Sequence, residues 1–252
     1  MFIQQGNRRQ FEQTREDPRY IYLGASKVAG AIGVPLYPED ERDLIWAAHM
    51  RVDGEAKPRK INEYAQKAIQ NGIELEPEAR AKFMKLFGLN VIQTGMHRCW
   101  DLPIVGAFPD GLIEGQNAGV ELKVLWRRAL PEFEDAIPLA WIVQSIVGAV
   151  CCRCDKWYLF IYKPWDFPYW VCYSIEEFDC AWSFIYKGIK DYEHHLKTGT
   201  KPQRVKKTGR ANINTAIRKG CRITPLYSSS SSELFGDLFT LPDDFEPDPV
   251  TA

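Results

Sequence analysis

The chain has 252 residues, enough for one sizeable hydrophobic core, and its 45% hydrophobic and 26% charged residues are typical of a globular protein. No run approaches the roughly 18 consecutive apolar residues of a membrane-spanning helix, and residues 1–17 are too polar for a secretory signal. The formal net charge of −1 and the odd number of cysteines, seven, argue against a strongly basic protein and a disulfide-stapled secreted scaffold. We therefore expect an intracellular protein, in the cytoplasm or the nucleus of its host cell.

The first part of the chain carries helical patterns. Residues 1–20 are interpreted as an irregular or partly helical arm, and Ser26 is expected to cap a short helix that ends before Pro35. A second helix is predicted over residues 39–49. From Lys60 to Phe87 apolar residues recur at helical spacing, which predicts a long helix followed by Gly88.

The pattern then changes to short β-prone runs, namely NVIQTG, PIVGAF, GLIEG and GVELKVLW. A helix is predicted over residues 138–150, buried strands over 157–162 and 169–175, and an amphipathic helix over 176–196. This order predicts an α/β (α+β) fold with a mixed central β-sheet flanked by helices.

Charge is distributed unevenly after Thr198, where the periodic pattern ends. Nine basic and no acidic residues lie between Lys197 and Arg222, and six acidic and no basic residues follow. Residues 1–222 therefore carry about +5, from 32 basic and 27 acidic side chains. We predict a folded domain over 1–200 and a basic segment over 201–222, which is either a phosphate-binding surface or simply solvated. We interpret 223–252 as an acidic, Ser/Pro-rich flexible tail, which either aids solubility or docks on a partner.

Three cysteines crowd into the sequence CCRC, as Cys151, Cys152 and Cys154. Their spacing is not that of a zinc clip, and no second cysteine pair has the spacing of metal or iron–sulfur ligands. We therefore interpret them as small buried hydrophobic residues.

The residues that indicate chemistry lie in the β-prone region. Pro109-Asp110-Gly111 is followed by Glu121-Leu122-Lys123, with a glycine-rich turn between them that predicts a hairpin. In an extended strand Glu121 and Lys123 share one face, and Asp110 joins them if it lies at the bend of the neighbouring strand. Two carboxylates can hold Mg²⁺ or Mn²⁺, and a lysine beside them can stabilise charge on a phosphate. This set favours phosphodiester hydrolysis over a surface hairpin with scattered charges, because unpaired Glu and Lys side chains on apolar strands would be costly.

These motifs resemble those of the PD-(D/E)XK nuclease superfamily, and their surroundings resemble the phage lambda exonuclease-like (viral recombinase) family within it. The segment from Gly72 to Gly88 is similar to the family's first active-site helix, with its pattern G-x-x-x-E-x-x-A-R. Glu76 and Arg80 stand at the glutamate and arginine of that pattern. PLAWIVQ is similar to the family's helix in which a glutamine, here Gln144, faces the metal site.

YIYLGASKV is similar to the family's N-terminal segment, in which an arginine and a serine hold a terminal 5′-phosphate. Arg19 and Ser26 fall at those positions. The resemblance covers roughly residues 19–175 and implies a restriction-endonuclease-like core.

The resemblance also implies a role for each residue. Asp110, Glu121, Glu76 and the Leu122 carbonyl would hold Mg²⁺, for which Mn²⁺ would substitute. Lys123 would act on the attacking water or on the charge of the transition state, and Gln144 would position the lysine or the water. Contacts to DNA or its 5′-phosphate are assigned to Arg19, Ser26, Arg80, Arg127 and Arg128.

The expected activity is exonucleolytic hydrolysis of linear double-stranded DNA, 5′ to 3′, in recombination or repair. The resemblance implies a ring-shaped homotrimer and a single-strand annealing protein as partner. One departure bears on polarity, because relatives often have a small hydroxyl residue where this chain has Phe108. A structure-specific or flap endonuclease with the same active site is the alternative. A DNA-binding protein that has lost catalysis is disfavoured, since the set Asp110, Glu121, Lys123 and Gln144 is intact.

Overall fold

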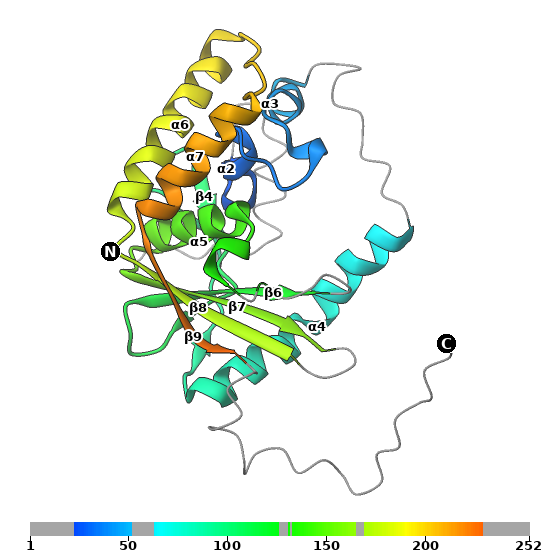
Figure 1. Ribbon diagram of the computed structural model, residues 1–252, viewed down its shortest axis with the longest axis vertical. Coiled ribbons are helices and arrows are strands. Elements are labelled where there is room, and N and C mark those ends of the chain that lie inside the picture. Colours follow the sequence, from blue (N-terminus) through cyan, green and yellow to red (C-terminus); the bar gives the residue numbers. More distant parts are fainter. Residues whose placement is uncertain (1–22, 52–62, 126–130, 132, 165–168, 229–252) are drawn as a thin grey trace, which may run out of the picture.

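The computed structural model describes residues 23–51, 63–125, 131, 133–164 and 169–228. Its centre is a six-stranded sheet with helices on both faces (Figure 1). The strands follow in the order β2 (Val91–Ile92), β5 (Gly111–Ile113), β6 (Ala118–Val124), β7 (Lys156–Lys163), β8 (Tyr169–Glu176) and β9 (Arg222–Ser228). Only the β6–β7 pair is parallel among these strands. The predicted mixed sheet flanked by helices is confirmed.

A small second sheet lies beside the first. It joins β1 (Leu23–Gly24), β4 (Val105–Ala107) and β3 (His97–Arg98), in that order. The β1–β4 pair is parallel and the β3–β4 pair antiparallel. Because β1 pairs with β4, it fixes the start of helix α2 (Ala25–Ala31), which follows it directly.

The helices divide between the two faces of the large sheet (Figure 1). One face is covered by α2 (Ala25–Ala31), α3 (Arg42–Met50), α5 (Leu139–Cys152), α6 (Asp179–Thr198) and α7 (Lys207–Lys219). The long helix α4 (Glu63–Phe87) packs on the other face through Ala79 and Phe83, which are fully buried against β6 and β7. Two short 3₁₀ turns, η1 (Pro38–Asp40) and η2 (Glu134–Ala136), precede α3 and α5.

Two glycines let α5 lie close to the sheet. A Cβ atom at Gly119 in β6 would approach the Trp157 ring to 2.3 Å, and one at Gly148 in α5 would approach it to 2.7 Å. Trp157 is fully buried between them. The indole therefore fills the space that both missing side chains leave, which brings α5 against the strand that carries Glu121.

Most predicted elements are present, with two corrections. The chain after Thr198 forms helix α7 and strand β9, where we had expected no regular structure. Helix α7 contacts α6, and β9 extends the sheet beside β8, so the first six residues of the expected tail belong to the fold. Ser26 is not a helix cap, because α2 begins at Ala25 with Gly24 as its N-cap.

Some predictions lie outside the described residues. These are the N-terminal arm with Arg19, the pair Arg127 and Arg128, and the part of the acidic tail after Ser228. None of the helices that the structure describes is long and apolar enough to span a bilayer. All seven cysteines are free thiols; Cys151 and Cys154 of the CCRC sequence are buried and Cys152 is partly buried.

Candidate active site

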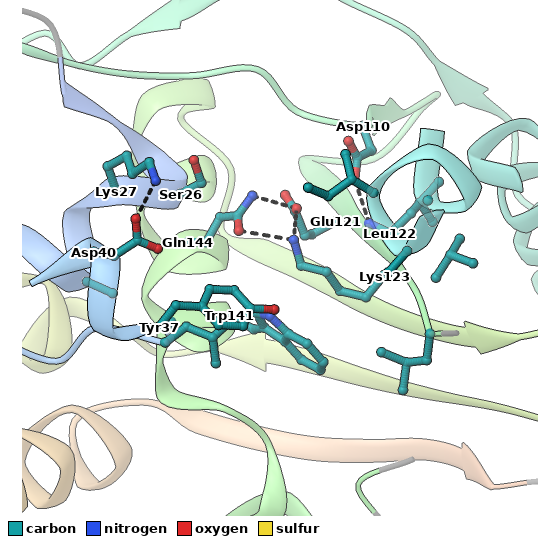
Figure 2. Close-up of a pocket in the computed structure, with 18 of the residues that line it drawn as sticks. Ser26, Lys27, Tyr37, Asp40, Asp110, Glu121, Leu122, Lys123, Trp141 and Gln144 are labelled. Atoms are coloured by element: carbon teal, nitrogen blue, oxygen red, sulfur yellow. Dashed lines mark hydrogen bonds and ion pairs between the residues drawn. The ribbon is translucent and has the colours of Figure 1, made fainter. Parts of the chain in front are cut away.

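A pocket of about 820 Å³ opens between α2, η1, the N-terminal half of α4, strand β6 and helix α5. It brings together six residues that the sequence singled out, Ser26, Glu76, Asp110, Glu121, Lys123 and Gln144. Figure 2 labels all of them except Glu76. Leu122 also lines it. Side chains from four separate parts of the chain therefore converge on one cavity.

The hairpin of β5 and β6 brings Asp110 close to Glu121. Gly111 pairs with Val120 and Leu112 with Gly119, and Asp110 lies in the bend directly before this paired segment. The backbone N–H of Leu122 donates to Oδ2 of Asp110 at 2.6 Å, which fixes the carboxylate at this position.

Alternation along β6 separates the core residues from the polar ones. Val120 and Leu122 are buried beneath α4, in the cluster that contains Phe83. Glu121 and Lys123 point to the opposite face, toward α5. The pattern read from the sequence is therefore present, with the polar pair facing the pocket.

Glu121, Lys123 and Gln144 form a closed triangle of hydrogen bonds (Figure 2). Oε1 of Glu121 accepts from Nζ of Lys123 at 2.5 Å and from Nε2 of Gln144 at 2.5 Å. Nζ of Lys123 also donates to Oε1 of Gln144 at 3.0 Å. Because Glu121 is only 5% exposed, these two partners satisfy a carboxylate that burial would otherwise destabilise. Gln144 thus fixes the positions of both residues.

The pocket holds Asp110 in an environment that disfavours its charge. Burial raises the pKa of Asp110 well above its ordinary value, and the neighbouring Glu121 carboxylate raises it further. Lys123 and the Leu122 N–H oppose this rise, while Glu76 adds to it. Three carboxylates therefore interact at this wall of the pocket.

Arg80 lies behind this wall and does not line the pocket. Its Nη2 donates to Oε1 of Glu76 at 2.5 Å, and its Nε donates to the main-chain carbonyl of Asp110 at 3.3 Å. The Arg80 side chain is 11% exposed. Its contacts tie α4 to the bend at Asp110, so a positioning role for Arg80 stands beside the predicted contact to DNA.

Among the polar and aromatic residues that line the pocket, sequence reasoning missed four, Lys27, Tyr37, Asp40 and Trp141. Nζ of Lys27 contacts Oδ1 of Asp40 at 2.5 Å. The sequence offered one signal for Lys27, which is that it directly follows Ser26. The position of Asp40 had no comparable signal, because it depends on how η1 packs against α2.

The charges of the pocket fit a divalent cation. Four carboxylates line it, from Asp40, Glu76, Asp110 and Glu121, against two ammonium groups, from Lys27 and Lys123. A phosphodiester would enter an acidic cavity, which a bound cation would neutralise. In the described part of the chain no three His, Cys, Asp or Glu side chains are already grouped as ligands. The cation could be held by Asp110 and Glu121, with Glu76, main-chain oxygen or water completing its shell.

Comparison with known proteins identifies the family. The model of the YqaJ-like viral recombinase domain matches residues 10–150, more than half of the chain. The chain belongs to the YqaJ-like viral recombinase family. This confirms the family that the motifs resemble. No curated protein sequence matches the chain.

Solved structures show the fold of the YqaJ-like chain. An alkaline exonuclease from Laribacter hongkongensis is 22% identical, over 72% of this chain and 91% of that one, with a TM-score of 0.53. Its complex with dAMP gives a TM-score of 0.55 at the same identity and coverage. A phage-related exonuclease from Haemophilus somnus 129PT is 17% identical over 57% of this chain and 69% of that one, with a TM-score of 0.44.

All the residues that line the pocket fall inside the matched YqaJ-like region. Strands β7 and β8, helices α6 and α7 and strand β9 follow it. The pocket therefore lies within the matched region, and the basic helix lies outside it.

Proposed function

We propose that the protein is a Mg²⁺-dependent DNA exonuclease, for which Mn²⁺ substitutes, that hydrolyses one strand of linear double-stranded DNA from its 5′ end in recombination or repair. The observation that carries the proposal is that the Asp110 and Glu121 carboxylates meet in one pocket, where Lys123 and Gln144 are hydrogen-bonded to Glu121. The fold supports it, because the similar solved structures are those of alkaline exonucleases.

Asp110 and Glu121 would hold the cation, with Glu76 and the Leu122 carbonyl as further oxygen ligands. A divalent cation supplies Lewis acidity toward water and the phosphate, and it neutralises charge that develops in the transition state. The carboxylates are already adjacent and held by Leu122 N–H and Gln144. The protein therefore orients both side chains before a cation binds.

Lys123 would act at the scissile phosphate. Its ammonium group carries three donors, of which Glu121 and Gln144 accept two. The third remains to donate to the phosphate oxygen or to orient the attacking water. The attack would be in line with the leaving 3′-oxygen of the adjacent nucleotide and would leave a 5′-phosphate and a 3′-hydroxyl.

The proposed preference for a 5′ end depends on the part of the pocket that α2 forms. Ser26 is exposed on α2 and lines the same pocket as the carboxylates. A hydroxyl at that place can donate to a terminal phosphate, as the family resemblance implies. Its distance along the pocket from Asp110 would set which phosphodiester bond is cut. The homotrimer and the annealing-protein partner are carried by the resemblance alone.

The test is digestion of matched substrates with Mg²⁺ and with a chelator. Linear duplexes with 5′-phosphate or 5′-hydroxyl ends would be compared with a covalently closed circle. We expect mononucleotides from the linear forms only, faster with the 5′-phosphate. Cutting of the circle, or discrete fragments from flaps, would support the endonuclease alternative. If nothing is cut with Mg²⁺ or Mn²⁺, the proposed function is wrong.

A further inference from the structure

Lys27 and Asp40 form an ion pair inside the pocket, away from the proposed cation ligands (Figure 2). Lys27 belongs to α2 and Asp40 to η1, and their Nζ and Oδ1 atoms are 2.5 Å apart. The Lys27 side chain is 52% exposed and the Asp40 side chain 18%. The two partners are thus unequal, since the carboxylate is shielded and the ammonium faces the cavity.

The fold fixes Asp40 more firmly than Lys27. The backbone N–H of Asp40 donates to the Tyr37 carbonyl at 3.0 Å. A Cβ atom at Gly30 would approach the Asp40 carbonyl oxygen to 2.2 Å, so η1 lies directly on the backbone of α2. The lysine has four methylenes and can move its ammonium group without disturbing α2. Asp40 therefore acts as a fixed anchor, and Lys27 can exchange partners.

Stability does not account for this pair. An ion pair with one exposed partner contributes little to the stability of the fold, because solvent screens the charges and ordering two side chains costs entropy. A fourth carboxylate in a pocket for a polyanion works against binding unless it is masked. Asp40 is masked by Lys27, and among the described residues Lys27 has no other partner, so two of its three donors remain.

We propose that the Asp40 carboxylate holds the place of a DNA phosphate, which displaces it as the partner of Lys27 when the strand enters the pocket. Lys27 is then a binding residue for the strand, and Asp40 lowers the affinity for DNA by competing for it. This inference rests on the proposed function, because it takes the occupant of the pocket to be DNA.

The test uses variants of the full chain, Lys27→Ala, Asp40→Asn and the double variant. Affinity for a short linear duplex would be measured by fluorescence anisotropy in a chelator, so that no strand is cut. We expect Lys27→Ala to bind about ten-fold more weakly, the loss of one charge-assisted hydrogen bond. The slope of its log affinity against log salt concentration should decrease by about the amount expected for one lost phosphate contact. Asp40→Asn should bind about three-fold more tightly, because the competing charge is removed. The double variant should match Lys27→Ala.

A purely structural ion pair would give a different result, because both single variants would lose thermal stability and change DNA affinity in the same direction. The matched control is the pair Lys156 and Glu176, whose atoms are 2.8 Å apart and whose side chains are 36% and 19% exposed, outside the pocket. Lys156→Ala and Glu176→Gln should leave DNA affinity unchanged. The inference is overturned if Lys27→Ala and Asp40→Asn change DNA affinity in the same direction, or if neither changes it. In that case the proposed function still stands, provided that the wild type binds and cuts DNA. Failure of the wild type to bind or cut DNA would overturn both.

Discussion

The Leu122 backbone N–H donates to Oδ2 of Asp110 at 2.6 Å, so the strand that carries Glu121 also holds the carboxylate opposite it. Asp110 lies directly before the paired segment of the hairpin, in which Gly111 pairs with Val120. The main chain of β6 therefore helps to orient the Asp110 side chain. Substitutions at this centre can therefore test chemistry with limited effects on its framework.

Replacement of Lys123 tests its role in catalysis. Lys123→Ala should lower kcat by about 100- to 1000-fold, the scale for losing one group that stabilises transition-state charge. Binding to DNA in a chelator should change little, because the other contacts of the pocket carry it. Single-turnover cleavage and anisotropy measure the two effects separately. Lys85→Ala, an exposed lysine of α4 outside the pocket, is the control. Wild-type cleavage by Lys123→Ala would show that the active site has been assigned wrongly.

Asp110→Asn should stabilise the cation-free protein at neutral pH. Burial and Glu121 raise the pKa of Asp110 in the folded state, so folding favours the protonated carboxyl. The wild type therefore loses stability as pH rises above the unfolded-state pKa of about 4, and Asn does not. With a chelator, the variant should have the higher Tm at pH 7, and the difference should shrink toward pH 4.

Added Mg²⁺ should reverse that order, since it stabilises only a protein that binds it. The Tm of the wild type should rise with Mg²⁺ concentration, and that of Asp110→Asn should not. Asp135→Asn, which replaces an exposed carboxyl in η2, serves as the control and should behave as the wild type. If Mg²⁺ raised the Tm of Asp110→Asn as much as that of the wild type, Asp110 would not be a ligand of the cation.

Arg80→Ala separates a positioning role from a DNA contact. Its bonds to Glu76 and to the Asp110 carbonyl predict a higher Mg²⁺ requirement, a lower kcat and a loss of about 1–3 kcal/mol in the free energy of unfolding. DNA affinity in a chelator should be unchanged. A weaker affinity with a smaller salt dependence would instead favour the contact predicted from the sequence.

Substitutions in the basic helix α7 test whether its lysines contact DNA. Lys206 and Lys207 are exposed at its start, and Lys207 lines a second, smaller pocket of about 360 Å³ that shares Leu36 and Ala140 with the first. If α7 contacts DNA, the double substitution Lys206→Glu and Lys207→Glu should weaken affinity and reduce its salt dependence by about two phosphate contacts. Lys85→Glu, on the other side of the sheet, is the charge-matched control. An unchanged salt dependence would mean that the basic segment is only solvated surface.

The sequence by itself determined the elements whose signals are local. The alternation around Glu121, the glycine turn at Gly115 with its positive φ of 74°, and the helical period before Phe87 each follow from neighbouring residues. The hairpin and the long helix were predictable for that reason. The convergence of Asp110 and Glu121 was predictable as well, given a bend at Asp110, because a short turn restricts the register of the hairpin.

The tertiary structure alone decided the contacts between distant segments. Gln144 reaches Glu121 because Trp157 fills the space left by two glycines and brings α5 to the sheet. Asp40 reaches Lys27 because η1 packs on Gly30.

Helix α7 and strand β9 had weak sequence signals for a related reason. Ile217 is the one fully buried side chain of α7 among the described residues, and Arg218 fixes that helix by donating to the carbonyls of Glu134 and Ile137. Strand β9 contains Pro225, which an edge strand tolerates because one side of its backbone needs no partner. Such elements are stabilised by the surface on which they pack, and their own sequence carries little of that information.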